Sequence, residues 1–221
     1  INWSNIDPKH RRLIMVGLML GMLAACLDGT IVSTCGTIIA ADLGGLSLYS
    51  WMFTAYMLCE TIAIPIGGKL SDLYGRKLML QTAVVVFVIG SMLAGLSQSM
   101  GQLIATRAIQ GLGGGMLMPV GMAVLFKVSP PEKRGQIMGI FGIPMLLGPA
   151  LGPVTSGWLL EYASWPWIFL INVPIGAIAV YIGLRSLPTF SSENSTAPLD
   201  VIGLALGPLA FSSLTYGISE S

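Results

Sequence analysis

Long apolar runs separated by short polar segments constrain this chain more than any other feature of its sequence. Runs of roughly twenty or more mostly apolar residues follow one another along the chain, and a helix needs about 20 such residues to cross a hydrocarbon core of about 30 Å. They cover residues 13–40, 50–68, 78–96, 102–126, 136–160, 167–187 and 201–218. Because 54% of the residues are hydrophobic and only 10% are charged, we predict an all-α polytopic membrane protein rather than a soluble one.

The placement of the cations predicts how this chain is oriented. Of the 11 Lys and Arg residues, all but Arg107 lie in alternate segments, which are therefore expected to be cytoplasmic. The resulting divisions are a cytoplasmic N-terminal segment at 1–12, a six-helix bundle at 13–187, a cytoplasmic connector at 188–200 and a seventh transmembrane helix at 201–219. The sequence ends directly after that helix, so we expect the chain to be the first part of a longer protein.

A charged segment at residues 68–77 stands out between the second and third runs. Gly68 and Gly75 bracket it and would supply the backbone freedom of a tight turn. Asp72 is placed either to cap a neighbouring helix or to pair with Arg76, and Lys77 adds a further cation. A positive-inside anchor would need the cations but not this spacing, which favours a gating loop.

Three ionisable residues are predicted within the membrane. Asp28 and Glu60 lie near the middle of the first and second runs, and Arg107 lies in the fourth. Each costs at least about 2.5–3.5 kcal/mol at the bilayer centre, so each should face the bundle interior and a partner. One Arg cannot neutralise two acids, and a carboxyl left partly unpaired can exchange protons near neutral pH. The alternative is a structural pair of Asp28 with Arg107. Tyr56, one turn from Glu60, could hydrogen-bond it or stack on a cationic ligand.

The fifth run combines regularly spaced glycines with prolines. Gly148 and Gly152 are four residues apart, which makes a smooth stripe against which another helix can pack. Pro149 and Pro153 remove backbone donors and favour bending, and Gly142 precedes them. Close packing alone would explain the glycines, whereas the prolines favour a helix that bends during a conformational cycle.

The sequence contains no constellation that would support catalysis. His10 is the only histidine and belongs to a basic flank, and the three cysteines lie inside apolar runs without metal-ligand spacing. The glycine-rich stretch of the fourth run lacks the following Lys and Ser or Thr of a phosphate loop. We therefore expect no enzyme activity, no metal, no cofactor and no nucleic-acid partner.

Five segments of the chain resemble one family of membrane carriers. They are residues 68–77, residues 27–32, Arg107 with Gln110 and Gly111, residues 148–152, and residues 165–176. The charged segment, the Arg107 segment and the 148–152 run are similar to motifs of the major facilitator superfamily. The other two are similar to its drug:proton antiporters with fourteen spans. The chain thus resembles the N-terminal part of such a multidrug efflux transporter.

This resemblance implies a fold and a set of roles. The fold is one six-helix half of a rocker-switch carrier followed by a linker helix, with the binding site at the midplane between two halves. Asp72 and Arg76 would hold one access state. Arg107 would modulate proton transfer, and Asp28 and Glu60 would bind protons and cationic drugs, while the glycines and prolines of the fifth run would keep the inter-helix seal tight.

The function implied by the resemblance is proton-coupled export of lipophilic, often cationic drugs, leading to antibiotic resistance. The implied partners are the drugs, protons, the lipid bilayer and a missing C-terminal half, and the proton gradient is the energy source. The implied location is a bacterial plasma membrane. One alternative is a major-facilitator importer or metabolite exporter, and a drug-accumulation assay distinguishes it from a drug exporter. A second alternative is a non-transporting membrane scaffold, and capture of a partner protein without proton-linked flux would favour it.

Overall fold

The computed structural model describes residues 7–187, 206–207, 209–210 and 213, which form helices and short connections without a strand. The helices are α1 (Pro8–Asp42), α2 (Tyr49–Tyr74), α3 (Arg76–Gly95), α4 (Met100–Val128), α5 (Arg134–Phe141), α6 (Ile143–Tyr162), α7 (Pro166–Leu170) and α8 (Asn172–Ser186), with short 3-10 turns η2 (Leu46–Leu48) and η3 (Pro131–Lys133). Residues 1–6, the predicted connector 188–200 and most of the predicted helix 201–219 lie outside the described residues.

Most of the described helices have the length and apolar composition of membrane spans. By these two criteria, 5 helical segments are suitable: Pro8–Asp42, Arg76–Gly95, Met100–Lys127, Pro131–Tyr162 and Pro166–Ser186. The α2 helix is 26 residues long, which is sufficient for a span, but Glu60 and Lys69 lower its mean hydropathy. With α2 included, and with α5–α6 and α7–α8 each forming one span, the described residues form an all-α bundle of six spans.

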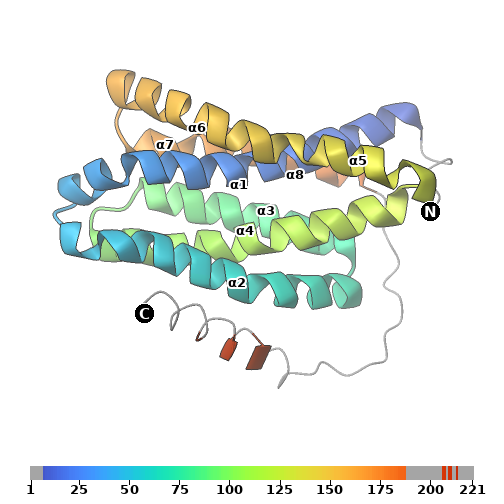
Figure 1. The fold of residues 1–221 in the computed structure, drawn as a ribbon, viewed down its shortest axis with the longest axis horizontal. Helices are drawn as coiled ribbons and strands as arrows, with labels where there is room; N and C mark the ends of the chain where they lie inside the picture. Colours follow the sequence, from blue (N-terminus) through green and yellow to red (C-terminus); the bar gives the residue numbers. More distant parts are fainter. Residues whose placement is uncertain (1–6, 188–205, 208, 211–212, 214–221) are drawn as a thin grey trace.

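The six spans lie side by side in two groups (Figure 1). The α4 helix packs between α2 and α3, α1 packs against α6 and α8, and contacts of α3 with α7 and α8 join the groups. The α2–α3 turn and the start of α1 lie at one end of the bundle, here called the Gly75 end. The α1–α2 and α6–α7 connections lie at the other, here called the Asp42 end.

The charged segment at residues 68–77, which the sequence predicted as a glycine-bracketed loop with a tight turn, is helical except at the turn itself. The α2 helix continues to Tyr74 and α3 begins at Arg76, so Gly75 alone connects them. Its φ of 94° is a conformation that glycine adopts without strain. Gly68 lies inside α2, and its predicted role as a turn residue was therefore wrong. One glycine at positive φ is enough to reverse the chain, so the polar residues before it stay helical.

Glycines of α4 allow α2 to approach it closely. A Cβ atom added at Gly111 would collide with the backbone of Tyr56, and one added at Gly115 would collide with the backbone of Glu60. On the other side, a Cβ at Gly90 of α3 would lie 2.7 Å from a backbone nitrogen of α4. Carbon atoms need about 3.5–4.0 Å for ordinary contact, so only glycine fits. These contacts place Tyr56 and Glu60 directly against α4.

The glycine stripe of α6 faces α1. A Cβ atom at Gly148 would lie 2.7 Å from the Cβ of Cys26, and one at Gly152 would collide with Thr30. The Thr30 hydroxyl donates to the Gly148 carbonyl oxygen at 3.1 Å, and Ser156, one turn further on, is fully buried. The predicted stripe therefore packs against the helix that carries Asp28.

The prolines of the fifth span do not break the helix where they occur. Pro149 and Pro153 lie inside the continuous helix α6, on exposed positions. The span is interrupted only at Gly142, between α5 and α6, next to Pro144, which has no N–H to donate to the preceding turn. Bending of this span during a transport cycle stays a prediction.

Candidate functional site

Asp28 lies in a buried polar network inside the bundle. Its carboxylate is 0% exposed and accepts hydrogen bonds from three side chains. Arg107 Nη1 donates to Oδ2 at 2.5 Å, while Gln110 Nε2 and Asn172 Nδ2 donate to Oδ1 at 2.7 and 3.1 Å. Arg107 is 1% exposed and also donates to Gln110 Oε1 at 2.7 Å. A buried ion pair needs such additional hydrogen bonds to offset the desolvation of both charges.

The network continues from Asn172 to the third span. Asn172 Nδ2 donates to the Ser91 hydroxyl at 3.0 Å, and that hydroxyl donates to the Phe169 carbonyl oxygen at 2.8 Å. Phe169 and Asn172 lie on either side of the break between α7 and α8. The network therefore connects α1, α3, α4 and the sixth span. Because its members are held from several helices, Asp28 has little freedom to reorient.

Tyr56 covers the guanidinium group of Arg107. The guanidinium carbon lies 4.2 Å from the centre of the Tyr56 ring and 5.8 Å from that of Phe169, within the range of cation–π attraction. Among the described residues, Tyr56 does not form the hydrogen bond to Glu60 that the sequence allowed, and its ring stacks on Arg107 instead. Within the described part of the chain, Arg107 Nε has no hydrogen-bond partner, and the two aromatic rings add cation–π attraction to the guanidinium group.

Glu60 lies in a different environment, in the wall of a cavity of about 470 Å³. The carboxyl is partly buried, and none of the described residues forms a hydrogen bond or ion pair with it. Tyr56 and Arg107 also line this cavity, together with residues of α1 and α6. The predicted acid pair is thus divided. Asp28 is paired with Arg107 and does not itself line the cavity, whereas Glu60 does.

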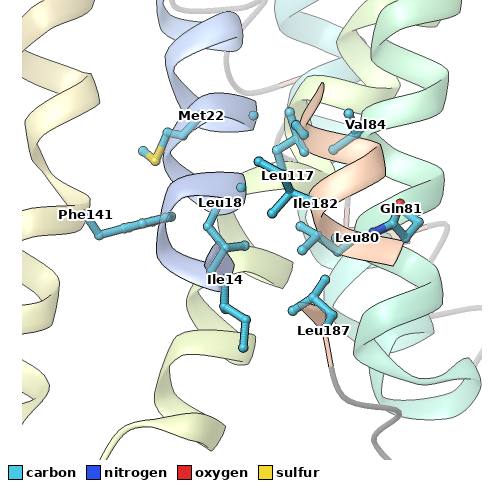
Figure 2. Close-up of a pocket in the computed structure, with 14 residues that line it drawn as sticks. Ile14, Leu18, Met22, Leu80, Gln81, Val84, Leu117, Phe141, Ile182 and Leu187 are labelled. Atoms are coloured by element: carbon cyan, nitrogen blue, oxygen red, sulfur yellow. The ribbon is translucent and has the colours of Figure 1, made fainter. Parts of the chain in front are cut away.

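A second, much tighter cavity lies towards the Gly75 end (Figure 2). Its volume is about 20 Å³, enough for a single water molecule. Apolar side chains such as Leu18, Leu117 and Phe141 surround it, and Gln81 is the amide at its edge. None of the ionisable residues predicted for the site lines this cavity, so the larger cavity is the candidate site.

Arg76 links the Gly75 turn to the fourth span. Its Nη1 donates to the Ala123 carbonyl oxygen of α4 at 2.8 Å, and its Nη2 donates to Asp72 Oδ1 at 3.3 Å. Of the two roles expected for Asp72, the structure therefore shows the pairing with Arg76, and no side chain caps α3. The pair is largely exposed on the Asp72 side, so its direct contribution to stability is small.

Lys77 links the same turn to the sixth span. Its Nζ donates to the carbonyl oxygens of Leu187 and Leu184 at 2.6 and 3.1 Å. These oxygens lie at the end of α8, where helix carbonyls lack intrahelical partners and carry partial negative charge. The sequence predicted Lys77 as a cation of the gating segment, and the structure shows which carbonyl oxygens it contacts.

Sequence reasoning missed three members of the buried network. Gln110, Ser91 and Asn172 each contact the network directly, although Gln110 was noted only for its resemblance to a motif. A signal existed for Gln110, because it follows Arg107 by three residues and shares its helix face. Ser91 and Asn172 are single polar residues in apolar runs, and the sequence alone does not show that they face Asp28.

Comparison with known proteins decides the family. The family described as Major Facilitator Superfamily matches residues 18–217 of the 221-residue chain. The chain belongs to the major facilitator superfamily. This major facilitator chain is therefore part of a multi-pass membrane transporter and not an enzyme, and its described helices form one six-helix half of the fold.

Two relatives in Bacillus subtilis (strain 168) carry names that state a substrate class. Multidrug resistance protein 3 is 44% identical over 174 residues, which are 79% of this chain and 34% of that protein. Multidrug transporter protein MdtP is 37% identical over 213 residues, which are 96% of this chain and 39% of that protein. This major facilitator chain thus spans between a third and two fifths of the length of these relatives.

A solved structure shows the same arrangement of helices. The proton:xylose symporter XylE matches with a TM-score of 0.72 at 15% sequence identity, over 80% of this chain and 45% of the symporter. At this level of identity the likeness concerns the fold alone. This likeness agrees with the six described spans forming one half of the carrier fold.

Proposed function

We propose that this chain is the N-terminal half of a proton-coupled antiporter that exports lipophilic, often cationic drugs across a bacterial plasma membrane. Two relatives named as multidrug proteins support the substrate class. The share of the relatives that this chain covers supports a second half, which would close the cavity from the opposite side. The observation that carries the proposal is the contrast between the two intramembrane acids.

The proposal assigns different roles to Asp28 and Glu60. Asp28 is fully buried and neutralised by Arg107, so its charge is already compensated. Glu60 lines a cavity large enough for part of a drug molecule and has no ion pair among the described residues. A carboxyl in such a site is stabilised either by a proton or by a cationic ligand. Glu60 is therefore the proposed exchange site, and Asp28 and Arg107 position the cavity wall around it.

The exchange follows from competition for one carboxyl. A lipophilic cation that enters from the cytoplasm places its charge beside Glu60, which releases its proton as the cation binds. After the carrier has opened to the outside, a proton from that side binds the carboxylate and the cation leaves. One positive charge replaces another at each step, so the membrane interior never contains an uncompensated carboxylate.

The Gly75 end is the proposed cytoplasmic side. The start of α1, the α2–α3 turn and the connection from α4 to α5 lie at this end (Figure 1), and they carry the cations Arg76, Lys77 and Arg134. The acids Asp42 and Glu161 lie at the opposite end. Cytoplasmic segments of membrane proteins are enriched in Lys and Arg, which supports this orientation.

Proton release on drug binding tests the proposal. Tetraphenylphosphonium is added to the complete purified transporter in weakly buffered detergent solution, and a pH dye records released protons. Binding is measured in parallel by equilibrium dialysis. We compare the wild type with Glu60→Gln and Asp28→Asn. The wild type should release protons on binding, and Glu60→Gln should abolish the release.

Other outcomes of this experiment separate the alternatives. Binding without proton release in any variant would refute proton exchange. Release that persists in Glu60→Gln but is lost in folded Asp28→Asn would move the exchange site to Asp28. Cellular drug accumulation then distinguishes export from import, since an importer raises the drug content of the cell and an exporter lowers it.

A further inference from the structure

Four methionines line the cavity that contains Glu60, and each comes from a different span. They are Met22 of α1, Met57 of α2, Met118 of α4 and Met145 of α6. Three of them present much of their surface, since Met57, Met118 and Met145 are 60%, 39% and 46% exposed. Thioether side chains therefore surround Glu60 from several directions.

Packing within the described part of the chain does not explain these three methionines. The protein uses buried methionines in its core elsewhere, for example Met52 and Met100 at 0% and 3% exposure, where the side chain fills a fixed space. Met57, Met118 and Met145 do not fill such a space, because they border the open volume beside Glu60. Their side chains therefore border space that a ligand in the cavity would occupy.

Thioether side chains suit a cavity that binds ligands of different shapes. Methionine is unbranched, has three rotatable side-chain bonds and a polarisable sulfur, and contacts aromatic rings favourably. Binding surfaces that accept many partners use such side chains because they can repack around each one. A leucine of similar volume has a branched, stiffer side chain and cannot follow the ligand in this way.

We propose that Met57, Met118 and Met145 determine the breadth of the ligand range by repacking around lipophilic aromatic cations of different shape. Glu60 supplies the charge that such ligands share, and Tyr56 supplies an aromatic face. The three methionines adapt to the part of each ligand that differs. This inference rests on the proposed function, because it concerns ligands of the same cavity.

Volume-conserving substitution tests this inference. Met57→Leu, Met118→Leu and Met145→Leu are made singly and together in the complete transporter. Met92→Leu is the matched control, because Met92 lies on α3, is 38% exposed and does not line the cavity. Binding of ethidium and rhodamine 6G is measured by fluorescence anisotropy, and binding of tetraphenylphosphonium by competition.

We expect the combined variant to bind at least one probe about tenfold more weakly while another changes little. A stiffer Leu that cannot repack leaves a misfit against that probe, and a misfit the size of one methylene in an apolar pocket has about this effect. The single variants should each affect different probes, and they keep the test valid if the combined variant does not fold. Met92→Leu should bind all probes as the wild type does.

Two other results would overturn the inference. If all probes shift by the same factor, or none shifts, the methionines do not set the range although the cavity still binds cations. If the wild type binds none of the probes, the proposed function itself fails, and this inference fails with it. The wild-type measurement therefore distinguishes the two failures.

Discussion

Replacing Asp28 by Asn tests whether charge holds the buried network together. Asn has nearly the same shape, but its amide NH₂ replaces one acceptor oxygen and faces a donor of Arg107, Gln110 or Asn172. The Arg107 charge also remains buried without a counter-charge. Removing one partner of a buried ion pair costs about 3–5 kcal/mol. We expect the free energy of unfolding of the complete transporter to fall by that amount.

The assay is equilibrium unfolding in detergent, followed by tryptophan fluorescence. Glu60→Gln is the control, because this carboxyl has no hydrogen bond or ion pair within the described part of the chain. It should change the free energy of unfolding by less than about 0.5 kcal/mol. Combining Asp28→Asn with Arg107→Met should cost less than the sum of the single variants, with a coupling of about 1–3 kcal/mol.

Two results would refute this reasoning. The first is equal destabilisation by Asp28→Asn and Glu60→Gln, which would mean that the two acids are held alike. The second is a coupling near zero between Asp28 and Arg107, which would mean that the close contact between them contributes nothing. Either result would also remove the basis for assigning proton exchange to Glu60 rather than to Asp28.

Three further substitutions, and Gly68→Ala as a control for the first of them, test the ends of the bundle. Gly75→Ala should destabilise the protein by about 1–2 kcal/mol because the φ of Gly75 is 94°. Gly68→Ala should be neutral or stabilising, because Gly68 is helical and has open space around it. Thermal unfolding measures both variants, and the reverse order of stability would restore Gly68 as the turn residue. Lys77→Met should cost about 1–2 kcal/mol and speed amide exchange at the end of α8; unchanged exchange would show that the lysine does not hold this end. Trp165→Phe removes the 2.6 Å hydrogen bond to Asp42 and should cost about 1–2 kcal/mol in denaturant titration, whereas a neutral result would show that water replaces it.

The helical architecture could be predicted from the sequence because it depends on local composition. Each apolar run must satisfy its backbone hydrogen bonds internally in a membrane, and a helix does this without help from other segments. The exact ends of helices were less predictable. The α2 helix continues through Ser71 and Asp72 to Tyr74, because the reversal needs only Gly75. Polar composition suggested a loop where the backbone is helical.

Part of the site was also predictable. The cost of burying Asp28, Glu60 and Arg107 required that they face the interior, and one cation could not serve both acids. The glycines of α6 indicated a close helix contact, which the structure shows at Cys26 of α1. These inferences needed only residue type and spacing.

The tertiary structure decided which acid Arg107 binds. Helical periodicity places a residue on a face of its own helix, but it does not state which face of another helix lies opposite. Packing of α1, α4 and α8 brings Arg107, Gln110 and Asn172 to Asp28, and packing of α2 on the α4 glycines leaves Glu60 in the cavity wall. The sequence by itself determined that the charges had to be buried together. Only the three-dimensional arrangement of the helices determined their partners, because contacts between distant segments depend on where each helix lies.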